Sequence, residues 1–256
     1  MTAELRPPPG VLPGEWDPPP ITLDPPCPVE VEQPHPSAWL LRGALTAADC
    51  VALAAAMAAS GRACPVSVSG HRDGDTRLGS VRATAWAPAL GAALWERVRG
   101  GVPSPRLMGD HTPTDWYALG ARRAHRRWRA VGVGPVLRFM RYEAGGQHCA
   151  HYDMAYDYPD ARRTLMSLVA YLTTAPPGSG GRTRIVRDGQ EGLPVWSRDH
   201  DDWTRPVRDD EVAAAVRPVQ GDILLFDHRL CHDVEHYTGT GSRVIVRGDV
   251  VFRAED

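Results

Sequence analysis

Short apolar runs separated by Gly- and Pro-rich turns dominate the chain from about residue 135 onward. This pattern is typical of β-strands joined by tight connections, and it predicts a β-rich C-terminal half. The plainest predicted strands are residues 136–142, 167–173, 183–186, 223–226 and 243–252.

Two of these predicted strands have two different faces. Because side chains alternate along a strand, residues 243–252 place Val244, Val246, Gly248, Val250 and Phe252 on one face and Arg243, Ile245, Arg247, Asp249 and Val251 on the other. Residues 167–173 likewise separate Leu168, Ala170 and Leu172 from Ser167, Val169 and Tyr171. The apolar faces are expected to pack against helices. Buried charges need partners or ligands, so the mixed faces predict a polar pocket inside a barrel.

The N-terminal half has helical patterns instead. An alanine-rich run over residues 47–59 follows Thr46, a good N-cap, and Asp49 lies in the first turn, where the helix dipole favours a carboxylate. Gly61 lies where a C-terminal cap is expected. Residues 88–99 predict a second helix, residues 113–130 a third and residues 209–216 a short fourth, while residues 65–69 predict a short strand and residues 71–75 a turn.

Helices followed by strands predict a mostly β protein with supporting helices (α+β), folded as a double-stranded β-helix, that is, a jelly roll or cupin-like barrel. Residues 1–36 contain half of the 24 prolines and are expected to be extended or disordered. Residues 37–256 are then expected to form a single domain. It comprises helical support over 37–134, a jelly-roll core over 135–253 and a lid-like insertion at 187–218.

Composition narrows the function classes. The formal net charge of −2 gives no electrostatic reason to expect nucleic acid or an anionic membrane as a partner. The sequence has no apolar run long enough for a membrane span and no secretory signal pattern, and its 5 cysteines are scattered. A cytoplasmic protein acting on a small-molecule substrate is expected, and the oligomeric state is not determined.

The candidate chemistry lies at His151-Tyr152-Asp153. A His-x-Asp in a strand places an imidazole and a carboxylate on the same face, and the distant His232 can complete three ligands on one side of a metal. That donor set is typical of non-haem Fe(II) oxygenases, in which the remaining positions stay open.

Other histidines compete for these roles. A second His-x-Asp, His200-Asp201-Asp202, lies in the polar insertion, where no strand is predicted. His148-Cys149-Ala150 has the His-x-Ala form of related halogenases, but the presence of Asp153 favours His151. His228 and His236 compete with His232 as the distal ligand. His232 has ten residues between it and Arg243.

Residues 135–253 resemble the Fe(II)/2-oxoglutarate dioxygenases, specifically the prolyl-4-hydroxylase-like branch. The matching segments are residues 141–147, 151–153, 171–173, 180–183 and 218–222, followed by His232 and Arg243 in the order of the family. The resemblance implies Fe(II), 2-oxoglutarate and O2 as cofactor and co-substrates. It also implies that His151, Asp153 and His232 are the metal ligands.

The resemblance implies further roles around the metal. Arg243 is expected to hold the far carboxylate of 2-oxoglutarate through paired hydrogen bonds, at a position where classical prolyl-4-hydroxylases usually have lysine. The other residues expected to contact the co-substrate are Tyr142, Tyr171 and Thr183. Arg247 and Asp249 either recognise a charged substrate or pair with each other, and Tyr156 is expected at the rim of the substrate site.

The implied reaction is hydroxylation of an unactivated C–H bond of a small molecule, such as an amino acid or biosynthetic intermediate, with release of succinate and CO2. One alternative is hydroxylation of a prolyl or other residue in a peptide or protein, including oxygen sensing. An alternative of another class is a non-catalytic cupin-like module with a structural or sensory metal.

Overall fold

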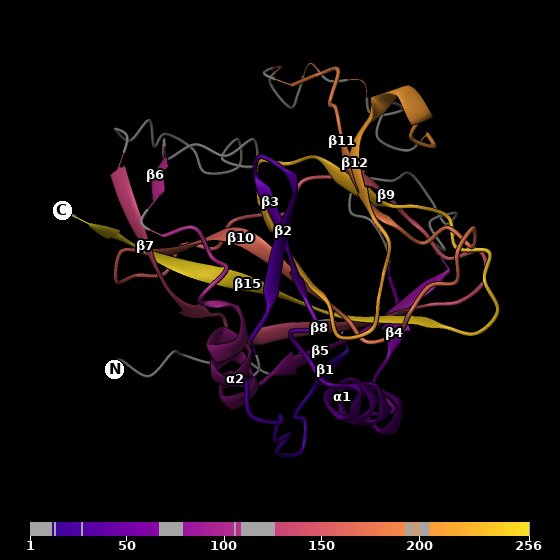
Figure 1. The fold of residues 1–256 in the computed structure, drawn as a ribbon, viewed down its shortest axis with the longest axis horizontal. Helices are drawn as coiled ribbons and strands as arrows, with labels where there is room; N and C mark the ends of the chain where they lie inside the picture. The colour runs from indigo at the N-terminus through magenta and orange to yellow at the C-terminus, as the bar shows by residue number, and fades with distance from the viewer. Residues whose placement is uncertain are drawn as a thin grey trace.

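The computed structural model describes residues 12, 14–26, 28–66, 79–104, 106–108, 126–191, 193, 197, 199 and 205–255. Two β-sheets and two helices make up its regular structure (Figure 1). Strands of the C-terminal half lie in both sheets, and the two helices lie together beneath the larger one. This is the jelly-roll arrangement of a mostly β protein with supporting helices, as expected from the sequence.

The larger sheet has 11 strands, and its central order is β1-β5-β8-β15-β10-β13-β3-β2. Its longest strand, β15, pairs with β10 on one side and with β8 and β7 on the other. The strands are β1 Glu15–Trp16, β2 Glu30–His35, β3 Ala38–Arg42, β4 Cys64–Pro65, β5 Ser80–Trp86, β6 Arg106–Met108, β7 Arg126–Val133, β8 Val136–Tyr142, β10 Arg162–Tyr171, β13 Ile223–Asp227 and β15 Arg243–Glu255.

The smaller sheet has four strands in the order β12-β11-β14-β9. These are β9 His148–His151, β11 Thr183–Val186, β12 Val212–Val216 and β14 His232–Val234. Both candidate histidine ligands lie on this sheet, in strands that pair directly.

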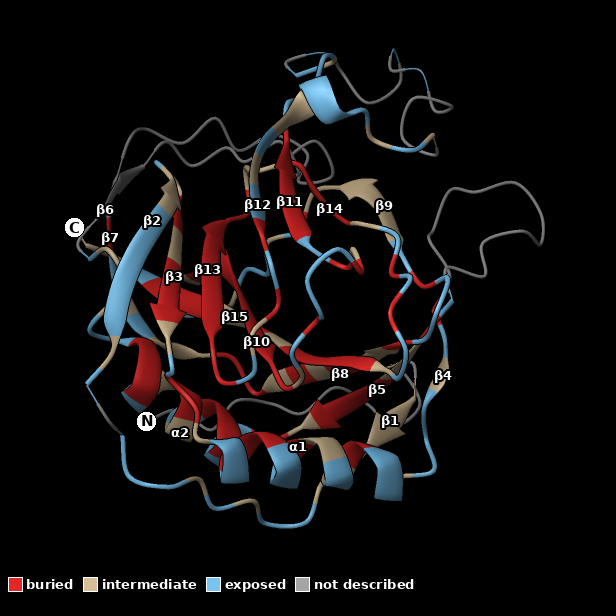
Figure 2. Cartoon of the chain, turned by 45° about the vertical axis from the view of Figure 1, so that its right-hand side comes forward, coloured by how far each residue is buried: buried red, intermediate tan, exposed pale blue. Residues whose placement is uncertain are grey.

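The two helices cover the outer face of the larger sheet. Helix α1 spans Ala47–Ala59 and starts with a reciprocal cap, in which Thr46 and Asp49 each accept a hydrogen bond from the backbone of the other. Helix α2 spans Pro88–Val98 and starts with a proline at its first position. The red, buried sides of both helices face the sheet in Figure 2, and their leucines join one cluster with Val244, Val246, Val250 and Phe252.

The other face of β15 points between the two sheets. Ile245 joins a second apolar cluster there with Val169, Phe226 and residues of the smaller sheet. Arg243 is buried on the same face, as the alternation along the sequence predicts. A strand with one apolar face and one mixed face therefore separates the helix layer from the barrel interior.

The Pro-rich N-terminal segment lies against the domain where it is described. Trp16 in β1 packs edge-on against Phe139, with ring centroids 5.3 Å apart, and Ile21 and Leu23 pack against the helix-side cluster. Strand β2 is an edge strand that contains Pro34 at an irregularity in its pairing, a place where a missing N–H costs no ladder hydrogen bond. The segment thus extends the sheet instead of standing apart from it.

Two predicted helices are wrong in their described parts. Residues 126–130, expected to end a third helix, belong to strand β7, and residues 109–125 lie outside the described residues. The predicted helix at 209–216 is a single 3₁₀ turn, Asp209–Glu211, followed by strand β12. Pairing with β11 outweighs the helix propensity of the three alanines in β12.

Other predicted boundaries also change. Strand β4 spans Cys64–Pro65 and shares only Pro65 with the strand expected at 65–69. Residues 67–78, including the expected turn, lie outside the described residues. Strands β3, β5 and β7 come from the region expected to supply helical support, so that region builds sheet as well as helices.

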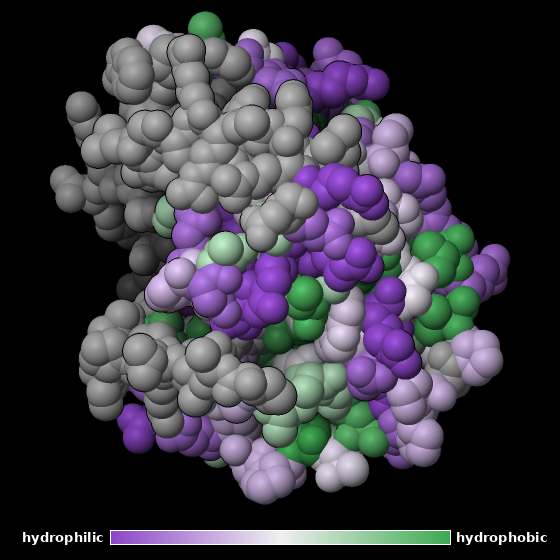
Figure 3. All heavy atoms as spheres, turned by 90° about the vertical axis from the view of Figure 1, so that its left-hand side faces the viewer, coloured by the Kyte–Doolittle hydropathy of each residue, from purple (hydrophilic) through white to green (hydrophobic). Residues whose placement is uncertain are grey.

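No helix among the described residues is long and apolar enough to cross a membrane. Hydrophilic side chains spread across the described surface on the side of β7, and hydrophobic ones form smaller separate groups there (Figure 3).

Candidate metal and co-substrate site

Three side chains converge between the two sheets. His151 at the end of β9 and His232 at the start of β14 are cross-strand partners, and their ring centroids lie 4.2 Å apart. Asp153 follows two residues after His151, with its carboxylate oxygens 3.8 Å from His151 Nε2 and 3.6 Å from His232 Nε2. One ligand atom from each residue lies within 4.8 Å of the others, so the three can hold one metal ion.

Backbone carbonyls orient both imidazoles. The Nδ1 atom of His151 lies 2.8 Å from the carbonyl oxygen of Cys149, and that of His232 lies 3.1 Å from the carbonyl oxygen of Leu230. Each ring can therefore donate through Nδ1 and present Nε2 with a free lone pair, the usual arrangement of a metal-binding histidine. Burial lowers the pKa of His151 to about 4 and also lowers that of His232, which keeps both rings neutral.

Two side chains hold the carboxylate of Asp153 in addition to its approach to the histidines. Ser167 Oγ donates a hydrogen bond to Oδ2, and Arg247 Nη2 lies 2.8 Å from Oδ1. Burial alone would raise the pKa of Asp153, but Arg247 and the neighbouring imidazoles together outweigh burial and hold the pKa well below its usual range. Asp153 is therefore held in place as an ionised carboxylate and remains a candidate ligand.

Arg243 lies fully buried, with 1% of its surface exposed. Its guanidinium carbon lies 4.8 Å from the ring centre of Tyr142 and 5.7 Å from that of Tyr171, and Nη2 donates to Thr183 Oγ1 at 3.3 Å. Tyr171 donates to the same hydroxyl at 2.9 Å. The four residues expected at the co-substrate are thus in one cluster.

Two donors of this guanidinium have no partner. Arg243 Nε and Nη1 are buried and make no hydrogen bond in the described structure. Leaving a buried charge with unused donors is costly, and a carboxylate can accept from Nη1 together with the second N–H of Nη2. The cluster therefore suits one end of a diacid such as 2-oxoglutarate.

Arg247 and Asp249 pair with each other, one of the two alternatives expected from the sequence. Arg247 Nη2 lies 3.0 Å from Asp249 Oδ1, which also lies 3.2 Å from Nε2 of the buried His228. Arg138 Nη1 approaches the other oxygen, Oδ2, at 3.3 Å. His228 thus contacts Asp249 and is not one of the three residues whose ligand atoms converge. His232, the other candidate for the distal ligand, is one of them.

The remaining candidates lie at the edges of the site or beyond it. His148 stacks on His151 with ring centroids 4.1 Å apart, and Tyr156 is 60% exposed and forms an edge-to-face pair with Tyr158. The second His-x-Asp, at residues 200–202, lies outside the described residues.

Sequence reasoning missed three polar residues that the structure brings to the interior: Ser167 as a partner of Asp153, and Arg82 and Arg138. Strand β5 was not predicted, although Ser80, Arg82 and Thr84 alternate there with Val81, Ala83 and Ala85. That period of two was the signal that could have found it.

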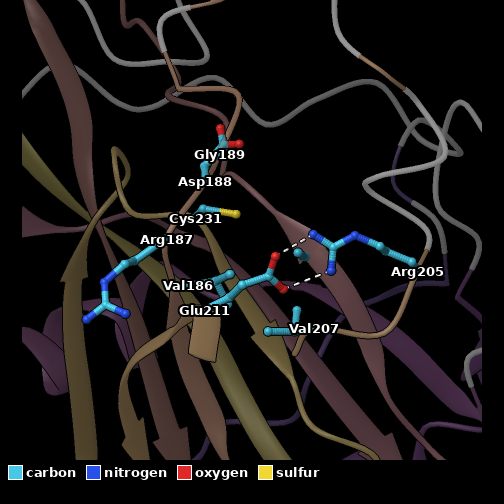
Figure 4. A pocket seen from close by; sticks show the side chains of 9 residues that line it. Val186, Arg187, Asp188, Gly189, Arg205, Val207, Glu211 and Cys231 are labelled. Carbon is cyan, nitrogen blue, oxygen red and sulfur yellow. Dashed lines mark hydrogen bonds and ion pairs between the residues drawn. The ribbon is translucent and has the colours of Figure 1, made fainter. Parts of the chain in front are cut away.

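A separate small pocket lies on the outer side of the smaller sheet (Figure 4). Ala150 and Cys231 line it, each next to a candidate ligand in the chain and therefore on the opposite face of its strand. The carboxylate of Glu211 points to the guanidinium of Arg205 in this pocket, with contacts of 2.8 and 2.5 Å. The pocket is thus separated from the three candidate ligands by the strands that carry them.

Comparison with known proteins agrees with this geometry. Residues 137–248 match the sequence model of the 2OG-Fe(II) oxygenase superfamily, and no curated protein matches the chain. Among solved structures, a prolyl hydroxylase from Trichoplax adhaerens in complex with a hypoxia inducible factor peptide fragment shares the fold. Its TM-score is 0.50 and its identity 12%, over 84% of this chain and 83% of that one.

Two further structures are similar at lower TM-scores. A Pseudomonas putida prolyl-4-hydroxylase has a TM-score of 0.47 and 17% identity over 86% of this chain and 94% of that one. HygX from Streptomyces hygroscopicus, with nickel and 2-oxoglutarate bound, has a TM-score of 0.48 and 12% identity over 85% and 82%. Residues 137–248 thus form a region that matches the 2OG-Fe(II) oxygenase superfamily, whose metal is Fe(II) and whose co-substrates are 2-oxoglutarate and O2.

Proposed function

We propose that this dioxygenase hydroxylates an unactivated C–H bond of a small molecule, such as an amino acid or biosynthetic intermediate, and releases succinate and CO2. The observation that carries the proposal is the buried, unsatisfied guanidinium of Arg243 in the same barrel interior as the three converging ligand atoms. A module with only a structural metal has no need of an unpaired buried cation beside it.

In this proposal His151, Asp153 and His232 hold the metal from one side. When bound, Fe(II) supplies the activation of O2 that is coupled to decarboxylation of the co-substrate. The neutral imidazoles offer Nε2, and Asp153 offers a carboxylate oxygen while Ser167 and Arg247 fix its orientation. Because the three ligands would all approach from one side, the other side of the metal would stay free for the co-substrates.

Arg243 sets the orientation of the co-substrate. Nη1 and the second N–H of Nη2 can donate to both oxygens of the far carboxylate, while the other N–H of Nη2 donates to Thr183, whose hydroxyl also accepts from Tyr171. Burial raises the pKa of Tyr171 to about 12, so its phenol stays protonated and keeps donating to Thr183. The apolar residues around them exclude water from this end of the barrel.

Four described cysteines are free thiols, which suits a reducing compartment. On this basis we propose that the enzyme acts in the cytoplasm.

The test is succinate formation by purified protein supplied with Fe(II), 2-oxoglutarate and air, in the presence of amino acids, small metabolites and proline-containing peptides. Products are scored for a mass gain of one oxygen. We expect a small molecule to stimulate succinate release, with Asp153→Ala inactive and the surface variant Asp160→Ala fully active. If only peptides stimulate succinate release, the substrate is a residue in a peptide and not a small molecule. If no succinate forms under any condition, the result favours a non-catalytic module.

A further inference from the structure

The inner face of strand β5 carries polar side chains that the metal and co-substrate do not account for. Val81 and Ala85 pack toward the helices, so Ser80, Arg82 and Thr84 point into the barrel. Arg82 is the cross-strand partner of Met140, whose side chain belongs to the interior cluster. A cation therefore lies on a face that otherwise lines the barrel.

Arg82 has no anionic partner. Among the described residues its guanidinium makes no ion pair and no hydrogen bond, and its Nε is buried. Burial lowers the pKa of Arg82, and the nearby positive charge of Arg247 lowers it further. The buried hydroxyl of Thr84, one step along the same face, also has no hydrogen-bond partner.

Arg138 lies next to Thr84, on the adjacent strand β8. Among the described residues its guanidinium approaches one carboxylate, that of Asp249 at 3.3 Å, and its side chain remains 30% exposed. Burial lowers the pKa of Arg138, and the charge of Arg247 lowers it further. Arg138 therefore keeps unused donors directed toward an accessible part of the interior.

The charges in this region do not balance. Arg138 and Arg247 share the carboxylate of Asp249, and Arg82 has no carboxylate partner among the described residues. The carboxylate of Asp153 is committed to the metal under the proposed function. Positive charge in excess, in a partly desolvated site, calls for a bound anion.

The co-substrate does not supply this anion at Arg138. Arg243 pairs across the sheet with Tyr142, whereas Arg247 pairs with Arg138, four residues further along β15. Four residues of strand span roughly 13 Å. A diacid anchored at Arg243 extends toward the metal. Arg138 lies farther from Arg243 along the sheet, opposite Arg247, whose guanidinium contacts Asp153.

We propose that Arg82 and Arg138 form an anion-binding subsite beside the metal site, and that the substrate therefore carries a carboxylate or phosphate group that these two side chains bind. This inference rests on the proposed function, and it narrows the substrate to small acidic molecules. Arg247 remains a positioning residue for Asp153.

The first test measures binding alone. Protein loaded with Ni(II) and 2-oxoglutarate is titrated with acetate and with inorganic phosphate by calorimetry. We expect at least one of the two to bind, and the preferred one distinguishes a carboxylate from a phosphate substrate. Arg82→Gln and Arg138→Gln should each weaken binding about 10- to 100-fold, the loss expected for a charge-assisted hydrogen bond. The control Arg141→Gln, at an exposed arginine on the same strand as Arg138, should bind as the native protein does.

The second test uses turnover. Small acids and their neutral amides are compared as stimulators of succinate release, and acids alone should be active. Arg82→Gln should raise the KM for the acid about 10- to 100-fold and leave the KM for 2-oxoglutarate unchanged.

Three results would overturn the subsite: no anion binding to the loaded native protein, native affinity for the anion in both variants, or equal turnover of an acid and its amide. Absence of succinate from native protein that still binds anions through Arg82 would instead count against the proposed function alone.

Discussion

Replacing Arg243 by methionine should separate folding from co-substrate binding. The guanidinium is buried between Tyr142 and Tyr171, and two of its donors have no partner without a bound anion. Methionine has a similar length, carries no charge and packs well against aromatic rings. We therefore expect the free energy of unfolding of the ligand-free variant to be unchanged or raised, because a desolvated charge is removed.

Binding of 2-oxoglutarate should change in the opposite direction. Hydrogen bonds to charged groups contribute about 1.5–3 kcal/mol each, so losing two of them should cost about 3–6 kcal/mol. That loss corresponds to a dissociation constant raised by roughly two to four orders of magnitude.

Thermal unfolding with and without 2-oxoglutarate, in the presence of Ni(II), measures both effects. At a ligand concentration about 100 times the native dissociation constant, the native protein gains about 2.7 kcal/mol. For a chain of this size that gain raises Tm by roughly 5–10 °C. Arg243→Met should show almost no rise, whereas the control Arg141→Met should match the native protein. A full rise in Arg243→Met, or severe loss of stability without ligand, would refute the assignment of Arg243 as an anchor.

Three further predictions follow from other contacts. Ser167→Ala removes the hydroxyl that donates to Asp153, so metal affinity measured by competition with a chelator should fall about 10- to 100-fold; an unchanged affinity would mean that Ser167 does not orient the ligand. Hydrogen bonds from Arg205 hold the pKa of Glu211 at about 2, below its unfolded value, so this contact stabilises the segment above pH 4.5 and is lost as pH falls toward 2. Residues 205–212 of the native protein should therefore become more sensitive to proteolysis as pH falls from 4.5 toward 2. Glu211→Gln should lack this pH dependence, and its persistence in the variant would refute the stabilising role of the contact. Trp16→Ala should lower the free energy of unfolding by about 1–3 kcal/mol in urea denaturation, because a half-buried ring leaves the helix-side cluster, whereas no change would mean that the N-terminal segment contributes nothing to stability.

The strongest predictions from the sequence rested on local, repeated signals. Helix α1 was predicted correctly because its cap and alanine-rich run agree with each other, and the alternation in β15 separated the helix side from the barrel interior. Strand β12 was predicted as a helix because Ala has high helix propensity, and its pairing with β11 is a tertiary effect that no local window contains. Strand β5 was missed because its apolar face is made of small residues.

The candidate site was partly predictable for the same reason. His151 and Asp153 share a local motif, and the order of the following motifs indicated His232 and Arg243. The contacts that complete the site join residues far apart in the chain, such as Ser167 with Asp153 and Arg138 with Asp249. These depend on strand register, which a single sequence does not specify for strands separated by long connections.

Anaerobic titration of the metal-free protein with Fe(II) tests the central claim most directly, since that claim is the convergence of His151, Asp153 and His232 on one ion. We expect one Fe(II) per chain in the native protein and binding at least 100-fold weaker in Asp153→Ala and in His232→Ala, with Asp160→Ala unchanged. Native affinity in both ligand variants would contradict the site described for this chain.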